Sequence, residues 1–183
     1  KKIMEELPAR LVVEAKELSR QLFATHEAFD FDFSLPDVNG ETVSLADYSG
    51  KVLIVDFCGT TYPPCRKAIP HLVYLLEKYK DAGLDIVGIH YENIEAEAAK
   101  KKIESFAAEY GIVHKCLIGD EDTRSRVPEF GGYPTTLFLD RSGVVRLKVM
   151  GVHPMEQLEA FVETLLEEPA EEDAERASAT ELP

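Results

Sequence analysis

Cysteine is scarce in this 183-residue chain, which has three, and tryptophan is absent. The cysteines, at positions 58, 65 and 116, are too few and too scattered for a disulfide scaffold or a zinc site, and they leave the redox compartment open. The histidines also lack the spacing of metal ligands, so we predict neither a metal nor another cofactor. These residues are His26, His71, His90, His114 and His153.

Long hydrophobic runs are missing as well. No stretch approaches the roughly 20 apolar residues of a transmembrane helix, and no signal peptide is recognisable. The chain starts with Lys-Lys-Ile rather than Met, so we expect a mature or excised portion and leave an upstream signal or anchor open. We predict no membrane contact from this portion.

Basic residues are outnumbered: 20 stand against 34 acidic ones, which gives a formal net charge of −14. This balance argues against nucleic acid and anionic membrane surfaces as partners. Part of the charge is local, because residues 167–183 hold seven acids and one arginine. From Glu168 onward the chain also lacks large apolar residues apart from Leu182. We therefore predict that 167–183 is an acidic, disordered tail.

The chain does have 45% apolar residues, enough for one domain with a sizeable core. Residues 52–57 are a nearly unbroken run of β-branched and aromatic side chains, typical of a strand buried on both faces of a parallel sheet. Residues 59–61 predict a loop, and the prolines at 63 and 64 can open a helix. A thiol at such a helix start, here Cys65, is tuned by backbone N–H groups and the helix dipole.

Residues 56–66 resemble the active-site strand and helix of the thioredoxin superfamily, most closely the TlpA/ResA-like thiol–disulfide oxidoreductases and the related redoxins. The family pattern is Asp/Asn-Phe-Trp-Ala-x-Trp-Cys-Pro-Pro-Cys-Arg. Without gaps, the residues that agree with it are Asp56, Phe57, Pro63, Pro64, Cys65 and Arg66. Cys58 and Thr61 stand where the family has Trp, and Tyr62 replaces the first, attacking cysteine. Because the first cysteine is missing, ordinary dithiol exchange by a Cys-x-x-Cys motif is excluded.

Two further stretches resemble this family. Residues 29–51 are similar to the entry hairpin of redoxins, with Asn39-Gly40 as a strong hairpin signal. Residues 131–140 resemble the segment Gly-x-Pro-Thr-Thr-x-Phe-Leu-Ile-Asp, whose proline is cis and faces the active site, so a cis Tyr133–Pro134 bond is implied. The resemblance covers 29–166. It implies a thioredoxin-like α/β fold, with a central mixed sheet flanked by helices and an N-terminal helix and hairpin added.

Hydrophobic periodicity supplies the other elements. Residues 3–25 predict an amphipathic helix that packs on the main domain, with a linker or dimerisation helix as the alternative. Pro70 predicts a kink in a helix at 64–80, and Gly111 predicts the end of a helix at 95–110. We expect strands at 84–91, 115–118 and 144–150, a short helix within 120–130 and a final helix at 155–166. The predicted division is an N-terminal helix at 1–28, a thioredoxin-like domain at 29–166 and the tail at 167–183.

The resemblance implies four candidate catalytic residues. Cys65 takes the place of the resolving cysteine, and an inert buried thiol is an equal alternative. Asp56 matches a buried acid that relays a proton to that cysteine, and burial is expected to raise its pKa. Tyr62 has no disulfide chemistry and is expected half-exposed at the mouth of the site. Glu92 lies where the family has an acid that tunes the cysteines, with a solvated loop acid as the alternative.

Tyr133, Pro134 and Thr135 are the candidate substrate-binding residues. In the family, the cis-proline exposes backbone groups that bind an extended peptide as an added strand. The implied partners are protein or peptide thiols and disulfides. The implied location is extracytoplasmic, either periplasmic or membrane-tethered.

Three functional hypotheses follow. The first is a thiol–disulfide oxidoreductase of altered design that uses Cys65 with Cys58 or Cys116. The second is a redox-inactive module that binds peptides in a groove between Tyr62 and Pro134. The third is peroxiredoxin-like peroxide reduction by Cys65, with the Tyr62 hydroxyl three residues before it. Cys58 and Cys116 are otherwise predicted to be core thiols. A Cys58–Cys65 disulfide, which needs about 4.4–6.8 Å between Cα atoms, is allowed across the loop but not expected.

Overall fold

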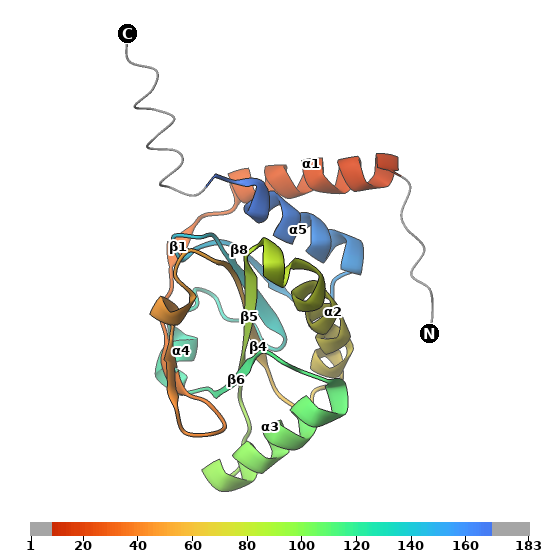
Figure 1. Ribbon diagram of the computed structural model, residues 1–183. Helices are drawn as coiled ribbons and strands as arrows, with labels where there is room; N and C mark the ends of the chain where they lie inside the picture. Colours follow the sequence, from red (N-terminus) through yellow and green to blue (C-terminus); the bar gives the residue numbers. More distant parts are fainter. Residues whose placement is uncertain (1–8, 170–183) are drawn as a thin grey trace.

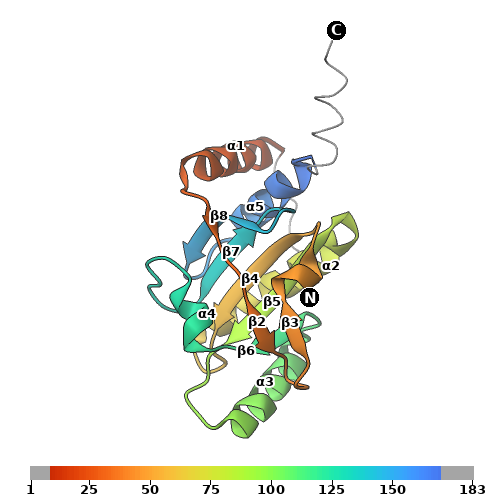
Figure 2. The same cartoon turned by 90° about the vertical axis from the view of Figure 1, so that its left-hand side faces the viewer.

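The computed structural model describes residues 9–169. The first residues of the predicted N-terminal helix, up to residue 8, and residues 170–183 of the predicted disordered tail lie outside the described residues. The strands are β1 (Phe29–Asp30), β2 (Ser34–Pro36), β3 (Thr42–Ser44), β4 (Val52–Cys58), β5 (Leu84–His90), β6 (Lys115–Ile118), β7 (Thr135–Leu139) and β8 (Val144–Met150). Six of them form one sheet in the order β1-β8-β7-β4-β5-β6, and β2 and β3 pair separately (Figures 1 and 2).

Helices cover both faces of this sheet. They are α1 (Ala9–Thr25), α2 (Pro63–Tyr79), α3 (Ala96–Tyr110), α4 (Glu121–Ser125) and α5 (Met155–Glu167), with short 3₁₀ helices η1 (Leu45–Tyr48) and η2 (Lys80–Ala82). Figure 1 shows α2, α3 and α5 on one side of the sheet and α4 on the other. The predicted α/β architecture, a mixed sheet flanked by helices, is confirmed. Within residues 9–169, no helix combines the length and apolar character needed to cross a membrane.

Strand β4 is the central element, as its continuous apolar run predicts. It pairs in parallel with β5 on one side and antiparallel with β7 on the other, and all its residues are buried. A strand enclosed on both edges and both faces has to be almost wholly apolar. The register places its single charged residue, Asp56, between Gly88 and Thr136.

Side chains of β4 alternate between two cores. Val52 and Ile54 belong to the core that α2 and α5 cover, whereas Phe57 belongs to the core behind the β2–β3 hairpin. Because successive strand residues point to opposite faces, Asp56 and Cys58 continue the row of Val52 and Ile54. Both therefore face the side of the sheet on which α2 lies.

Turn and cap residues stand where the sequence predicts them. Asn39-Gly40 joins β2 to β3, and Gly40 adopts φ +84°, a conformation that favours glycine. Asp37 Oδ1 accepts the N–H group of Asn39 at 2.8 Å and stabilises this turn. Helix α3 ends at Gly111, whose φ is +65°. Helix α2 continues through Pro70, and the kink expected at this residue stays a prediction.

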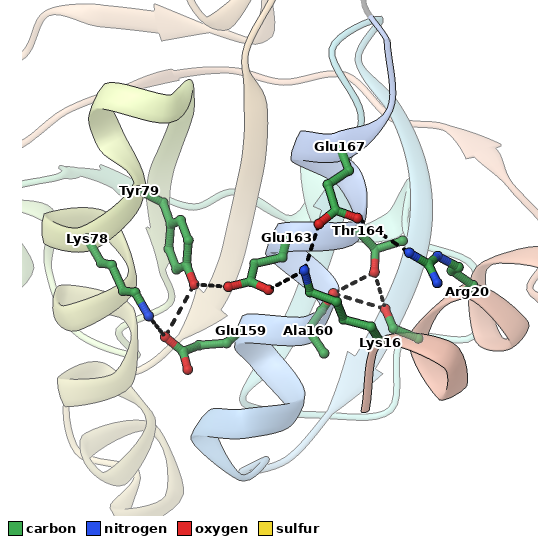
Figure 3. A network of polar contacts seen from close by, with 10 residues as sticks. Lys16, Arg20, Lys78, Tyr79, Glu159, Ala160, Glu163, Thr164 and Glu167 are labelled. Carbon is green, nitrogen blue, oxygen red and sulfur yellow. Dashed lines mark hydrogen bonds and ion pairs between the residues drawn. The ribbon is translucent and has the colours of Figure 1, made fainter. Parts of the chain in front are cut away.

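Helix α1 packs across α5, as predicted for a helix seated on the main domain (Figure 3). Ser19 Oγ donates to the Ala160 carbonyl at 3.2 Å. Lys16 Nζ forms ion pairs with Glu163 at 2.9 Å and with Glu167 at 2.6 Å. These contacts join two segments that are about 150 residues apart in the sequence.

The same polar network reaches α2 (Figure 3). The Tyr79 hydroxyl donates to Glu163 at 2.6 Å, and Lys78 Nζ pairs with Glu159 at 2.7 Å. The last turn of α2 is thereby fastened to α5, and through Glu163 it is also connected to Lys16 of α1.

Candidate active site at the start of helix α2

The candidate site is built where β4 ends and α2 begins. Tyr62, in an extended conformation, caps the helix without a side-chain hydrogen bond, and Pro63 and Pro64 fill its first two positions. Proline has no N–H group, so the first turn of α2 offers few donors to a thiol. Donors to Cys65 therefore have to come from the loop that precedes the helix.

Cys65 is fully buried on the side of α2 that faces the sheet. Its sulfur accepts the N–H group of Gly59 at 3.5 Å. A hydrogen bond with the Cys58 thiol, followed by this N–H group, lowers the pKa of Cys65, although burial and the charges of Asp56 and Glu92 act in the opposite direction. The net result is a pKa of Cys65 below the ordinary value of a cysteine thiol.

Asp56 is 1% exposed, and Thr136 Oγ1 donates to its Oδ1 at 2.8 Å. Burial raises the pKa of Asp56 to about 7, although its hydrogen bonds with Thr136 and Cys58 lower it in part. The predicted upward shift is confirmed. Cys58 follows Asp56 by two residues on the same face of β4, whereas the resemblance assigns the proton relay to Cys65.

Glu92 lies two residues beyond β5, and its side chain is 3% exposed. Its Oε1 accepts the N–H group of Thr60 at 2.6 Å, and its Oε2 pairs with Lys102 Nζ at 2.9 Å. Burial raises the pKa of Glu92, but Lys102 and Thr60 more than offset this effect, so the pKa is lowered. Glu92 is therefore a buried, ionised anchor of the active-site loop and not a solvated loop acid.

Aromatic rings surround the mouth of the site. Tyr62 is 46% exposed, and the centroid of its ring lies 5.5 Å from that of Tyr133. The ring of Tyr133 also lies 5.6 Å from Tyr91 and 5.3 Å from Phe130. Arg124 Nη1 donates to the Tyr133 hydroxyl at 2.8 Å and fixes the position of that ring. Tyr62 is thus half-exposed, as the sequence predicts.

The Tyr133–Pro134 peptide bond is cis, as the resemblance implies. Pro134 and Thr135 are both buried. The Pro134 carbonyl accepts the N–H group of Gly151 at 2.9 Å, and Thr135 Oγ1 donates to the Gly132 carbonyl at 2.6 Å. Among the described residues, the main-chain N–H and C=O groups of Tyr133 have no hydrogen-bond partner. Of the three candidate binding residues, Tyr133 therefore presents open main-chain groups.

A separate hollow of about 750 Å³ lies at the other end of β4. Tyr48, Lys51, Asp140 and Arg141 contribute to its lining, and none of the candidate site residues does. Chemistry at Cys65 is therefore remote from this hollow.

The family model of the AhpC/TSA family matches residues 26–148, about two thirds of the chain. The chain belongs to the AhpC/TSA family. It is 31% identical over 128 residues to the thioredoxin-like protein YneN of Bacillus subtilis, covering 70% of this chain and 73% of that protein. It is 29% identical over 134 residues to the thiol-disulfide oxidoreductase ResA of Geobacillus kaustophilus, covering 73% of this chain and 74% of that protein.

A solved structure extends the likeness from sequence to fold. The thiol:disulfide interchange protein, a thioredoxin family protein from Chlorobium tepidum, is similar with a TM-score of 0.66 and 25% identity, over 75% of this chain and 94% of that one. This AhpC/TSA-family chain is thus a TlpA/ResA-like member of the thioredoxin superfamily, as the sequence resemblance predicts.

The sequence predicts that Cys58 is a core thiol, with a pairing to Cys65 in one of the three hypotheses, and does not place it among the candidate catalytic residues of this AhpC/TSA-family chain. The structure confirms that Cys58 is buried, and it places Cys65 Sγ 3.5 Å from the N–H group of Gly59, the residue that follows Cys58. The available signal was the spacing of Asp56 and Cys58, because residues i and i+2 of a strand share a face. Cys116 lies apart on β6, where burial raises its pKa to about 12.

Proposed function

We propose that the protein is a thiol–disulfide oxidoreductase in which Cys65 is the reactive thiol and disulfides of peptides or proteins are the substrates. The observation that carries this proposal is the position of Cys65 at the start of α2, where the Gly59 N–H group donates to its sulfur at 3.5 Å and helps to lower its pKa. ResA, a relative by sequence, is named for this activity. The extracytoplasmic location implied by the family resemblance belongs to the same proposal.

The neighbouring residues have distinct roles in this scheme. Asp56 accepts a thiol proton, because its pKa of about 7 lets it exist in both protonation states near neutrality. Glu92 holds the loop through Thr60, and its negative charge acts to raise the pKa of Cys65. Tyr62 supplies apolar contact at the entrance rather than chemistry, because a phenol forms no disulfide.

Substrate binding is assigned to the surface beside Tyr133. The open N–H and C=O groups of Tyr133 are the pair that an extended peptide needs to add as a strand. The rings of Tyr62 and Tyr133 provide apolar contact beside that strand. Pro134 and Thr135 lie beneath this surface and fix the direction of the backbone at Tyr133, because both residues are buried.

Peptide binding without redox turnover is the second candidate function. It is favoured by the full burial of Cys65, which denies a substrate disulfide direct access to the sulfur. Peroxide reduction gains less from the geometry, because the Tyr62 hydroxyl makes no hydrogen bond to Cys65 among the described residues. Both alternatives are separate arms of the test below.

Replacing Cys65 with Ser should abolish reduction of a dye-labelled glutathione disulfide driven by dithiothreitol, a loss on the order of 100-fold or more. Cys116→Ala is the matched control, because it removes a buried thiol that lies outside the site, and it should keep the wild-type rate.

We also expect this protein to reduce insulin disulfides much more slowly than a Cys-x-x-Cys thioredoxin does, because Tyr62 occupies the position of the attacking cysteine.

The outcomes of this test separate the candidates. Full activity in Cys65→Ser would refute the proposal. An inactive wild-type chain that still binds an extended peptide, with binding weakened by Tyr133→Ala, would support the binding module instead. Consumption of hydrogen peroxide that depends on Cys65, without turnover of any disulfide, would point to peroxide reduction.

Tyr62→Cys should raise the disulfide reductase rate by more than about tenfold, because it recreates Cys-Pro-Pro-Cys at an exposed helix start. The introduced thiol should titrate below about 8.5 and pair reversibly with Cys65. Thiol titration against pH and turnover of the labelled disulfide measure both effects. Thr61→Cys, one residue away in the same loop, is the control and should gain little.

Two results of the Tyr62→Cys experiment would contradict its premises. A disulfide that forms without activity would mean that the groove no longer accepts the substrates of Cys-x-x-Cys enzymes. Failure of the two thiols to pair would mean that Tyr62 does not correspond to the attacking cysteine.

A further inference from the structure

The two cysteines at the junction of β4 and α2 form a close pair. Both are fully buried, and both thiols are free. Cys65 Sγ accepts the N–H group of Gly59, the residue directly after Cys58, at 3.5 Å. The six intervening residues therefore fold back and bring the sulfur of Cys65 to the end of β4 that carries Cys58. Close approach of this kind is the geometric requirement for a disulfide.

Asp56 adds a proton acceptor beside this pair. It precedes Cys58 by two residues on the same face of β4. Thr136 occupies its Oδ1 atom, while its Oδ2 atom is buried and has no hydrogen-bond partner among residues 9–169. The Cys58 thiol interacts with the same carboxyl. A buried carboxylate with an open oxygen beside a thiol is placed to take the proton of that thiol.

The two thiols differ in acidity, as expected if one attacks the substrate and the other resolves the mixed disulfide. The hydrogen bond between them lowers the pKa of Cys65 and raises the pKa of Cys58. Burial and the charge of Asp56 raise the pKa of Cys58 further. Because the thiolate is the nucleophile in disulfide exchange, Cys65 is the thiol that attacks first. Cys58 keeps its proton and needs a base before it can react.

We propose that Cys58 and Cys65 are the redox pair of this protein, with Cys65 attacking, Cys58 resolving and Asp56 serving as the base for Cys58. This proposal rests on the proposed function, because it requires Cys65 to exchange with a substrate disulfide. It moves the resolving role from the helix cysteine to a cysteine in the strand.

The steps balance in atoms and electrons. The Cys65 thiolate attacks a peptide disulfide, a mixed disulfide forms, and one substrate thiolate is released. Cys58 then passes its proton to Asp56 and attacks Cys65 Sγ. The Cys58–Cys65 bond forms, and the second substrate thiolate leaves. Two electrons thereby pass from the protein dithiol to the substrate disulfide.

Access to the pair depends on the loop 59–62. Because both sulfurs are fully buried, a substrate reaches Cys65 only when this loop shifts. The ring of Tyr62 packs directly on Gly59, where an added Cβ atom would lie 2.5 Å from the ring. The same movement that uncovers Cys65 leaves Cys58 in β4, because β4 is held on both edges by β5 and β7.

Oxidation of the full chain by glutathione disulfide tests the pair. The reduced, denatured protein should show three thiols by Ellman titration, and the oxidised protein should show one. Mass spectrometry should find Cys58 linked to Cys65 and no lasting glutathione adduct. Cys116→Ala should form the same link. Cys58→Ala should instead retain glutathione on Cys65, at a level more than about tenfold above the wild-type level.

The results that would overturn the pair differ from those that would overturn the proposed function. A wild-type chain that keeps the Cys65 adduct as strongly as Cys58→Ala would refute the pair and leave exchange at Cys65 intact. A link from Cys116 to either thiol would also refute it. Absence of both adduct and disulfide in all variants would remove both proposals. Cys58→Ser, checked by circular dichroism, should repeat the result of Cys58→Ala and exclude a packing defect as the cause.

The role of Asp56 has its own readout. In Asp56→Asn, formation of the adduct on Cys65 should not slow, whereas its resolution by Cys58 should slow by about tenfold or more. The pH dependence of the resolution rate near pH 7 should disappear in the same variant. An unchanged resolution rate with an unchanged pH profile would show that Asp56 is not the base.

Discussion

The Asp56→Asn protein should be more stable than the wild type by about 2–4 kcal/mol at pH 8. Burial raises the pKa of Asp56 to about 7, whereas an unfolded aspartic acid loses its proton near 3.8. Between these two values the folded state holds a proton that the unfolded state has released. Stability from this group is therefore complete below pH 4 and is lost as the pH rises through 7. Asparagine keeps an acceptor for Thr136 and removes the buried charge.

Urea denaturation at pH 4, 6 and 8 measures this effect. The stability difference between Asp56→Asn and wild type should be smallest at pH 4 and grow toward pH 8. Asp85→Asn, the same chemical change on the neighbouring strand β5, is the control and should show no such gain, because Asp85 is partly exposed and paired with Lys51. A difference that does not vary with pH would contradict the assignment of a buried, proton-binding Asp56.

His90 and His114 should produce the second large effect, a loss of stability in acid. Both side chains are buried, and none of their four ring nitrogens has a partner among the described residues. Burial lowers the pKa of each ring to about 4, and in His114 the charge of His90 adds to this effect. The pKa of an unfolded histidine is near 6.5. Below that pH the unfolded state therefore binds protons that the folded state does not bind. Stability therefore falls as the pH drops from about 6.5 to about 4.

The magnitude follows from the size of the shifts. Each histidine contributes a slope of about 1.4 kcal/mol per pH unit, or about 3 kcal/mol over the whole window. For two histidines this total, about 6–7 kcal/mol, is comparable with the whole stability of a typical domain. Asp56 acts in the opposite direction over the same range and offsets part of the loss in the wild type.

The histidine effect is isolated by substitution. His90→Leu and His114→Leu should each make the pH dependence of unfolding between 4 and 6.5 shallower by about one proton. His153→Leu serves as the control, because His153 is half-buried and both its ring nitrogens have partners. Equal slopes in all three variants and the wild type would show that the buried pair does not resist protonation.

The parts of this protein that follow from local chemistry could be predicted from the sequence. The apolar run of β4, the Asn39-Gly40 turn and the glycine at the end of α3 each determine structure within a few residues. Cys65, Asp56 and Tyr62 could be found as site candidates because they stand in one continuous motif.

The pairing of side chains across the fold could not be predicted in this way. Cys58 meets Cys65 because the loop folds back at the Gly59 N–H group, and no residue in the loop signals that contact. His90 and His114 come together because Gly88 in β5 aligns with Cys116 in β6, so that the ring of His90 in β5 and the ring of His114, directly before β6, share one face. Strand register depends on the whole sheet and is not visible in a local pattern.

Helix α2 is held to its neighbours at both ends, and this determines where it can bend. Its last turn is bound to α5 through Lys78 and Tyr79, in contacts continuous with α1 (Figure 3). Near its start, Arg66 donates to the Tyr110 hydroxyl at 3.0 Å and to the Thr60 carbonyl at 3.2 Å, and it forms an ion pair with Glu109 at 2.8 Å.

Between the two ends, Pro70 lacks the N–H group that would donate to the Arg66 carbonyl, so helix α2 is least stiff there. The helix is thus a rod held at both ends, with its least stiff segment in between. Any bending at Pro70 therefore changes the angle between the turn that carries Cys65 and the turn that is bound to α5.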